Sequence, residues 1–244
     1  MSVSERYRQA WESYWKETPD DPGEAIWDAD PSLSAAPHTE LLAPYADAPL
    51  PVLDLGCGNG TQTRYLATRF PRAIGVDLSW AAVEHARRAD TARVAEFRQL
   101  SLTDADGVRE LHDELGDAHV YMRAVIHQSD AGDRQPVAEA VATLVGARGR
   151  AFVVELTEAS KTTLARLAES PGGPPAKLRR VFDHGLRPAD AADVEVPELL
   201  ATAGLEILAE GPTALAQTEQ WPDGSRVELP ARWFVVGRHR TKLG

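Results

Sequence analysis

The chain of 244 residues contains a single cysteine, Cys57. One cysteine cannot form an internal disulfide bond, and it excludes a zinc site built on several thiolates. We expect Cys57 to be a small packed residue in a reducing compartment. No apolar run approaches the roughly 18 residues that a membrane helix requires. The charged opening, MSVSERYRQAWESYW, lacks the apolar core of a signal peptide. We therefore expect a cytoplasmic protein that does not enter a membrane.

Positive charge is also scarce. The chain has 26 lysines and arginines against 37 acidic residues, which gives a formal net charge of -11. Such a charge works against attraction to the phosphates of nucleic acid or of an anionic membrane surface. We predict no nucleic-acid partner. The length fits one α/β domain with an added cap.

The middle of the chain alternates between apolar runs and helical patterns. Five continuous apolar runs predict buried strands, at residues 49–55, 72–78, 93–100, 118–126 and 149–157. Four segments between them have helical periodicity, at residues 61–70, 79–90, 104–116 and 134–146. Ser79 is a suitable N-cap for the second of these helices, and Pro136 lies near the expected start of the fourth. Continuous apolar strands joined by helices predict a parallel sheet covered on both faces.

The C-terminal part departs from this alternation. A helix at 196–204, closed by Gly204, precedes two strands at 205–211 and 232–240, with the turn PDGS between the strands. Because no helix separates these strands, we expect them to be antiparallel neighbours. The predicted fold class is α/β, with a seven-stranded, mostly parallel sheet, an antiparallel last strand and helices on both faces.

Two segments lie outside this core. Residues 1–45 are predicted to form an N-terminal helical cap or lid, and residues 46–244 the main domain. Four aromatic residues of the cap follow helical spacing and form one stripe: Tyr7, Trp11, Tyr14 and Trp15. Residues 158–188 are predicted to be a helical insertion in the main domain, where ASKTTLARLAES leads into the Gly/Pro-rich PGGPPAK.

The most informative stretch is VLDLGCGNGTQTRYLATRF, from Val52 to Phe70. Gly56, Gly58 and Gly60 follow its strand and precede its helix. In an open parallel sheet, ligands bind beyond the carboxyl ends of the strands, and the loop after the first strand lines that crevice. Glycines let a ligand touch the backbone, and the helix start offers free N–H groups.

Asp77 ends the second strand, where a carboxylate can accept both hydroxyl hydrogens of a ribose. Loop and carboxylate together predict a nucleoside-containing cofactor. The dinucleotide pattern G-x-G-x-x-G fails at Thr61, because the glycines instead run D-x-G-x-G-x-G from Asp54. An acidic residue beside the loop suits a ligand with an ammonium or sulfonium group and repels a pyrophosphate.

At this point the sequence resembles a known family. VLDLGCGNG followed by IGVDLS is similar to the cofactor site of class I S-adenosylmethionine-dependent methyltransferases, and the expected element order resembles their Rossmann-like fold. The likeness covers residues 50–157 by motif and about 190–240 by topology only. It implies S-adenosylmethionine as cofactor and in-line methyl transfer to a small organic acceptor, with oxygen slightly favoured over nitrogen, sulfur or carbon. Two alternatives stay open: the same fold binding this cofactor for a non-transferase role, and an NAD-dependent oxidoreductase.

The resemblance also implies roles for individual residues. Gly56, Gly58 and Gly60 would lie against the methionine part of the cofactor. Asp54 would lie near its amino group, and Asp77 would hold the ribose hydroxyls.

On the adenine side, the resemblance implies that Leu78 packs on the ring and that Ser101 and Leu102 flank it. Many relatives have an aspartate at the place of Ser101, so either Ser101 or Asp104 would accept from the adenine amino group. The backbone around Arg123 would meet the methionine end.

The acceptor side is less defined by sequence. His127, just after the fourth strand, is the candidate general base, which would matter most for a hydroxyl acceptor; the alternative is a structural histidine that caps a helix or bonds to Asp130. Four residues of the cap are candidate substrate contacts or else only packing: Tyr14, Trp15, Trp27 and His38. We predict no metal site, since the spacing of histidines and carboxylates matches no metal pattern. The sequence leaves monomer and homodimer open.

Overall fold

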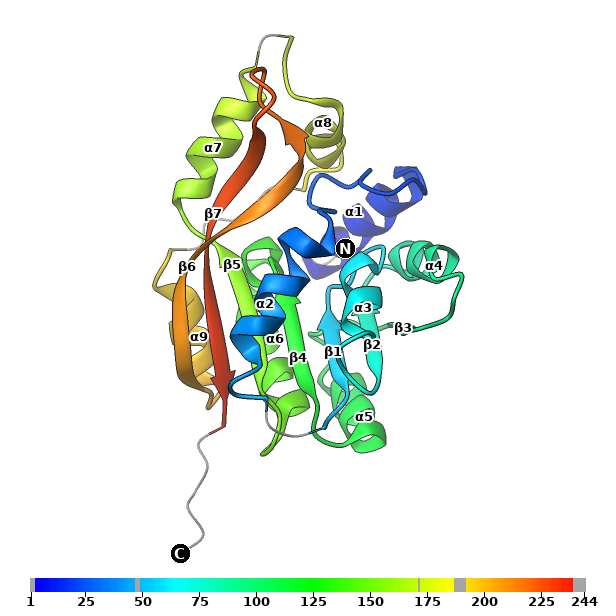
Figure 1. Ribbon diagram of the computed structural model, residues 1–244, viewed down its shortest axis with the longest axis vertical. Coiled ribbons are helices and arrows are strands. Elements are labelled where there is room, and N and C mark those ends of the chain that lie inside the picture. Colours follow the sequence, from blue (N-terminus) through cyan, green and yellow to red (C-terminus); the bar gives the residue numbers. More distant parts are fainter. Residues whose placement is uncertain (1–2, 47–48, 171, 187–191, 239–244) are drawn as a thin grey trace, which may run out of the picture.

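The computed structural model of the chain describes residues 3–46, 49–170, 172–186 and 192–238, and it contains a seven-stranded sheet in this part of the chain (Figure 1). The strand order is β3-β2-β1-β4-β5-β7-β6. The strands are β1 (Val52–Leu55), β2 (Ala73–Asp77), β3 (Glu96–Gln99), β4 (His119–Arg123), β5 (Ala151–Leu156), β6 (Glu206–Gln220) and β7 (Arg226–Gly237). The first five pair in parallel, and β7 is antiparallel to both β5 and β6. The predicted fold class is confirmed.

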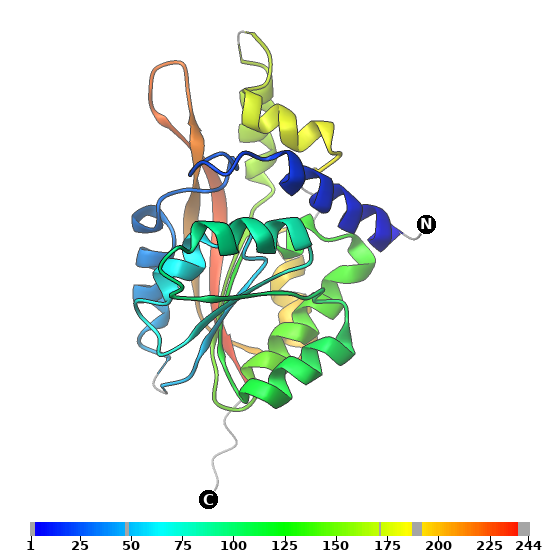
Figure 2. The same ribbon diagram turned by 90° about the vertical axis from the view of Figure 1, so that its right-hand side faces the viewer.

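Helices cover both faces of this sheet (Figure 2). They are α1 (Val3–Glu17), α2 (Ala35–Leu42), α3 (Thr61–Leu66), α4 (Trp80–Ala89), α5 (Ala105–Leu115), α6 (Ala131–Val145), α7 (Ala159–Ala168), α8 (Ala176–Asp183) and α9 (Glu195–Thr202). The side chains of β1 alternate between the two faces of the sheet. Leu53 and Leu55 are buried in one cluster with α5, α6 and α9, and Val52 is buried in another with α2 and α3.

Two helix ends test the local predictions. The Ser79 side chain accepts from the Ala82 N–H at 3.2 Å and caps α4 as predicted. The predicted start of the helix at residue 134 is wrong, because α6 begins at Ala131 and Pro136 lies inside it. Proline lacks an N–H and so removes only the bond to the Gly132 carbonyl, which a fifteen-residue helix tolerates here.

The hairpin of β6 and β7 is longer than predicted. Pairing continues beyond the sheet to Gln220 and Arg226, on either side of the predicted turn. We predicted strands only at 205–211 and 232–240, of which residues 239 and 240 lie outside the described residues. The sequence signal is weak because Pro212 and Pro230 interrupt the strands, yet both prolines are accommodated within the pairing. The extension rises above the carboxyl edge of the sheet beside α7 (Figure 1).

A separate apolar cluster lies above the carboxyl ends of the strands. It joins α1, α7, α8 and the end of the hairpin through Tyr14, Trp15, Ile26, Leu167, Leu178, Val181, Val227 and Leu229. Polar contacts tie the same parts together: Lys177 Nζ donates to Thr218 Oγ1 at 3.2 Å, and the Arg166 guanidinium lies 4.5 Å from the Trp221 ring centre. Helix α2 does not belong to this group, because it packs on the face of the sheet. In the described part of the chain, no helix has the length and apolar character needed to span a membrane.

Candidate active site

A pocket lies at the carboxyl edge of the sheet, where the strand order reverses between β1 and β4. Its lining comes from the loop after β1, the ends of β2 and β4, helix α1, helices α7 and α8, and the hairpin. A second hollow adjoins it toward β3 and shares Tyr7, Gly56, Asp77, Leu78 and Val125 with it. The two together form one crevice that runs from β3 to the hairpin.

The glycine loop forms one wall of this crevice. Gly56 and Gly58 line the pocket with φ of +71° and +53°. A Cβ on Gly58 would lie 2.8 Å from the Trp15 ring, so any other residue would be strained and also crowded. Gly60 does not reach the lining. It starts α3, and a Cβ there would meet the Phe97 ring at 2.5 Å, so its role is in packing behind the loop.

Asp77 holds the loop in place. Its Oδ2 accepts from the Gly58 N–H at 3.0 Å, and its Oδ1 accepts from the Ser79 N–H at 2.9 Å. Burial raises the pKa of Asp77 to about 6, although these N–H donors oppose the shift. Asp77 and Leu78 both line the crevice.

Asp54 lies behind the loop and not among the residues that line the crevice. It is buried on β1, and its Oδ2 accepts from the Thr63 hydroxyl at 2.5 Å. Burial raises its pKa to about 6, and the charge of Arg123 works against that shift. Through this hydrogen bond to Thr63, Asp54 holds the first turn of α3 against β1 and so supports the loop between them.

At the β3 end, Ser101 and Leu102 line the second hollow. The Ser101 hydroxyl lies 2.8 Å from that of Thr103. The alternative, Asp104, caps α5 by accepting from the Gly107 N–H at 3.2 Å and is not in the lining. Of the two candidates for the adenine contact, the fold brings Ser101 to the crevice.

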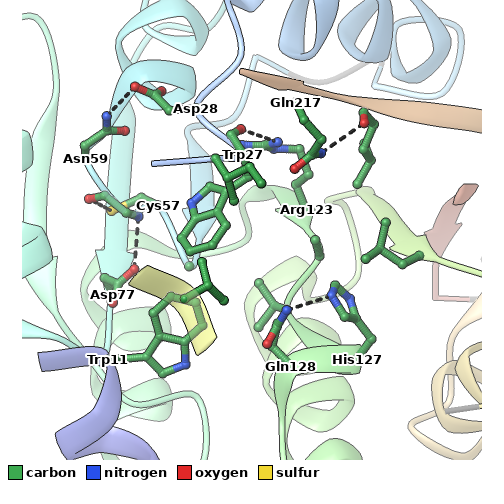
Figure 3. Close-up of a pocket in the computed structure, with 18 of the residues that line it drawn as sticks. Trp11, Trp27, Asp28, Cys57, Asn59, Asp77, Arg123, His127, Gln128 and Gln217 are labelled. Atoms are coloured by element: carbon green, nitrogen blue, oxygen red, sulfur yellow. Dashed lines mark hydrogen bonds between the residues drawn. The ribbon is translucent and has the colours of Figure 1, made fainter. Parts of the chain in front are cut away.

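His127 lies in a short 3-10 helix after β4, Ile126–Gln128, and lines the pocket (Figure 3). Its Nδ1 is 2.6 Å from Oε2 of Glu155, and both side chains are buried. Glu155 also accepts from the backbone N–H groups of Val125, Ile126 and His127, at 2.9, 2.8 and 3.2 Å. A carboxylate can only accept, so Nδ1 carries a proton and Nε2 is left to accept one.

Sequence reasoning did not select Glu155, although a single acidic residue in the apolar run FVVELT was a usable signal. A buried carboxylate needs partners. Asp130 was the alternative partner proposed for His127. It is instead the N-cap residue of α6, and His127 pairs with Glu155.

Arg123 ends β4 and reaches toward the N-terminal segment. Its Nη1 donates to the Trp27 carbonyl at 3.0 Å, and its side chain lines the pocket (Figure 3). Asp28, next to Trp27, accepts from the Asn59 amide at 2.7 Å. The cap segment is therefore fastened to β4 and to the glycine loop on either side of the crevice.

The aromatic stripe divides between the pocket and the core. Tyr7, Trp11 and Trp15 line the pocket, as does Trp27. Two of the predicted substrate contacts need correction. Tyr14 is completely buried between its aromatic neighbours and does not reach the lining, because it faces the cluster with α8.

His38 is the second correction. It lies on α2, stacks on Phe152 with the ring centres 4.8 Å apart, and its Nδ1 is 2.9 Å from the Tyr121 hydroxyl. Burial lowers the pKa of His38 to about 3. It is a core histidine against the sheet, away from the pocket.

The wall opposite the loop is apolar. It comes from β5, α7, α8 and β7, through Leu156, Leu164, Leu178, Val181, Phe182 and Leu229. Gln217 of β6 also lines the pocket and bonds to the Leu215 carbonyl at 3.0 Å (Figure 3). The sequence did not place the hairpin here, because its extension was not predicted.

Within the described residues, no group of three or more histidine, cysteine or carboxylate side chains is placed to hold a metal ion. Cys57 is buried, and burial raises the pKa of its thiol. It packs beside Phe97 and α4.

An open sheet of this order, with a glycine loop after β1 and a carboxylate at the end of β2, is the arrangement expected of a class I S-adenosylmethionine-dependent methyltransferase. Residues 52–149 match the family described as "Methyltransferase domain". A solved S-adenosylmethionine-dependent methyltransferase from Anabaena variabilis is 31% identical, with a TM-score of 0.87, and the match covers 96% of this chain and 95% of that one. The chain belongs to this family, which removes the NAD-dependent alternative.

Two further comparisons show a shared fold and a partial sequence match. The magnesium protoporphyrin IX methyltransferase from Synechocystis PCC 6803, solved with bound SAH, shares the fold with a TM-score of 0.55 and 16% identity, over 84% of this chain and 81% of that one. A trans-aconitate 2-methyltransferase from Methylobacterium radiotolerans is 50% identical over 93 residues. That match spans 37% of this chain and 33% of the relative, so the likeness does not extend to the relative's whole length.

The cofactor of this family is S-adenosylmethionine, and the residues present fit it. Gly56 and Gly58 leave bare backbone at the crevice, where a side chain would fill the space, and the Asp77 carboxylate lines the crevice beside them.

Proposed function

We propose that this protein transfers a methyl group from S-adenosylmethionine to an oxygen atom of a small organic acceptor, with His127 as general base. The observation that carries the proposal is the buried His127–Glu155 pair at the wall of the same pocket that the glycine loop lines. A thiolate or carboxylate acceptor would not need this base, whereas a hydroxyl must lose a proton.

The crevice supports a specific placement of the cofactor. In our proposal the methionine part lies against Gly56 and Gly58 near Arg123, and the ribose hydroxyls donate to Asp77. Adenine lies in the second hollow, and three residues of that hollow contact it: Leu78, Ser101 and Leu102. Asp54 and Gly60 support the loop from behind.

The bound cofactor supplies a methyl group already activated by its sulfonium charge. The chain's own residues then align the acceptor and exclude water, and alignment alone can contribute on the order of 7–11 kcal/mol. His127 Nε2 takes the hydroxyl proton, while the Nδ1–H group keeps its hydrogen bond to Glu155. In the structure this Nε2 lies 3.1 Å from the Gln128 amide nitrogen, so Gln128 must release it before the proton moves.

The surroundings of the pocket support further parts of the proposal. Residues 1–45 supply a lid through α1 and Trp27, residues 46–244 form the catalytic domain, and the segment 158–188 completes the acceptor site through α7 and α8. Residues 171, 187 and 188 of that segment lie outside the described residues. We propose a cytoplasmic monomer or homodimer that acts on a small molecule rather than on nucleic acid or a membrane, in agreement with the net charge of -11.

The names of the curated relatives provide a second candidate, a carboxylate-rich acceptor such as trans-aconitate. The lining agrees poorly with it. Among the described residues around the pocket, Arg123 is the one arginine or lysine, and Asp28 and Asp77 line it too. A hydroxyl on an apolar body therefore agrees better with the charge of this pocket.

Methyl-labelled S-adenosylmethionine tests the proposal with a panel of small hydroxyl, carboxylate, amine and thiol compounds, with methylated product detected by mass spectrometry. The H127N variant should lose ~10²–10⁴ in turnover of hydroxyl compounds. H112N is the matched control, because His112 pairs with Asp117 just before the amino end of β4 and does not line the pocket. Full turnover of a hydroxyl compound by H127N would exclude the base, and absence of any methylated product despite tight cofactor binding would exclude the transfer.

A further inference from the structure

Two buried polar atoms in the acceptor pocket lack a hydrogen bond of standard length to the described residues. They are the amide oxygen Oε1 of Gln128 and the indole nitrogen Nε1 of Trp11, whose polar neighbour is the Tyr7 hydroxyl. Both residues line the same pocket, and Figure 3 shows the nitrogen edge of Trp11 on the side of the Gln128 amide. Unpaired buried polar atoms are rare and costly, so a donor and an acceptor left together in one pocket point to a ligand that meets both.

The direction of the Gln128 amide follows from its neighbours. Glu155 can only accept, so His127 carries its proton on Nδ1. His127 Nε2 then accepts, and the Gln128 atom 3.1 Å away must be the amide nitrogen. Its oxygen is consequently turned away from His127 and kept as an acceptor. Three side chains in a row fix which atom the pocket presents.

This donor and acceptor select the chemistry of the group between them. The group must accept from the Trp11 N–H and donate to Gln128 Oε1. A hydroxyl does both at one atom, whereas a carboxylate cannot donate, an ammonium cannot accept and an ether only accepts. A neutral amine also does both, but the His127 base in the same pocket favours a hydroxyl, which must lose its proton.

The rest of the pocket selects the body that carries this hydroxyl. The wall from Leu156 through α7 and α8 to Leu229 is apolar. Arg123, the cation of the lining, already donates to the Trp27 carbonyl, and Asp28 already accepts from Asn59 and from the Gly23 N–H at 2.9 Å. A polycarboxylate would be left with few partners and two nearby carboxylates.

We propose that the acceptor is an uncharged, largely apolar alcohol or phenol, and that Trp11 and Gln128 are the residues that recognise its hydroxyl. This inference rests on the proposed function, and it names the substrate class. Before the reaction the Gln128 amide turns away from His127, so that its nitrogen frees Nε2 and its oxygen gives up the hydroxyl hydrogen. The O–H bond then breaks and its proton moves to His127 Nε2, while the oxygen forms a bond to the methyl carbon as the sulfur–methyl bond breaks. The ether product can no longer donate to Gln128, which favours its release.

The test measures binding, so it does not depend on turnover. Protein saturated with S-adenosylhomocysteine is titrated calorimetrically with matched pairs that differ in the hydroxyl: 2-naphthol against 2-methylnaphthalene, and cyclohexanol against methylcyclohexane. trans-Aconitate serves as the polycarboxylate probe. The wild type should prefer at least one hydroxyl compound over its partner by about tenfold, and W11F and Q128M should each reduce this preference ~3–10-fold. The preference is a ratio, so a general loss of packing in a variant largely cancels.

Two control variants make the same chemical changes elsewhere: W80F, at an exposed tryptophan on α4, and Q135M, at a glutamine that bonds to Glu139 on α6. Both should keep the wild-type preference. Equal binding of the two members of every pair, tighter binding of trans-aconitate than of any hydroxyl probe, or an unchanged preference in W11F and Q128M would overturn the inference. If hydroxyl preference is present but no probe is methylated, the substrate class stands and the proposed transfer fails. Weakened S-adenosylhomocysteine binding in W11F and Q128M with unchanged hydroxyl preference would assign the pair to the cofactor and overturn the inference.

Discussion

Replacing Glu155 by glutamine (E155Q) removes the charge that holds His127 and leaves the shape of the side chain almost unchanged. Glu155 accepts four hydrogen bonds, three from backbone N–H groups and one from His127 Nδ1. A glutamine can accept only at its oxygen, so its NH₂ group must face either His127 or the N–H groups of Val125 and Ile126. One or two bonds to a charged acceptor are lost, each worth about 1.5–3 kcal/mol, and we expect the free energy of unfolding to fall by about 3 kcal/mol.

The effect on His127 separates a catalytic pair from a structural one. With NH₂ at the position of Oε2, Nδ1 must accept, and the imidazole proton moves to Nε2. That nitrogen can then no longer take a proton from the acceptor, and turnover of a hydroxyl compound should fall ~10²–10⁴. Nitrogen NMR of the imidazole, assigned by comparison with H127N, should show the change of tautomer directly.

Unfolding by urea, turnover and the NMR spectrum are measured together, with E139Q on the exposed face of α6 as control. The double variant H127N/E155Q should lose little more turnover than H127N alone, because the two residues act as one unit. If E155Q loses stability but keeps its turnover and its Nδ1–H tautomer, the reasoning that makes Glu155 a positioning residue is refuted.

Three further predictions concern the glycine loop. Burial raises the pKa of Asp77 to about 6, and Asp77 should bind ribose hydroxyls as the carboxylate. The affinity for S-adenosylhomocysteine should therefore rise about tenfold from pH 5 to pH 7 and then level off, whereas D77N should bind weakly and without this rise; calorimetry at each pH decides. Burial raises the pKa of Asp54 to about 6, so the free energy of unfolding of the wild type should fall as the pH rises from about 4 through 6. In urea unfolding, D54N should be as stable as the wild type near pH 4 and more stable at pH 8, by up to about 3 kcal/mol. An advantage of D54N that is the same at both pH values would contradict this. G58A should unfold roughly 2–4 kcal/mol more easily, because its φ of +53° and the Trp15 ring 2.8 Å from the new Cβ both oppose it; a variant as stable as wild type would show that the loop adapts.

The fold and much of the cofactor side were accessible from the sequence because their signals are local. Apolar runs mark strands, and the glycine loop joins β1 to α3 within ten residues of chain. Asp77 and Ser101 follow because parallel strands bring their carboxyl ends to one edge of the sheet. Asp54 and Gly60 mark the limit of this reasoning, because a motif shows that residues belong together and not which of them faces the crevice.

The acceptor side depended on contacts between distant parts of the chain. His127 and Glu155 are 28 residues apart and meet only because β4 and β5 are neighbours. Trp11 reaches the pocket while Tyr14 does not, a difference that helical spacing cannot resolve because it depends on what packs against each side of α1. By itself the sequence determined the sheet and the class of cofactor, since strand periodicity and loop geometry are properties of short segments. The tertiary structure alone decided which side chains surround the acceptor, since that depends on how the cap, the insertion and the hairpin fold back over one edge of the sheet.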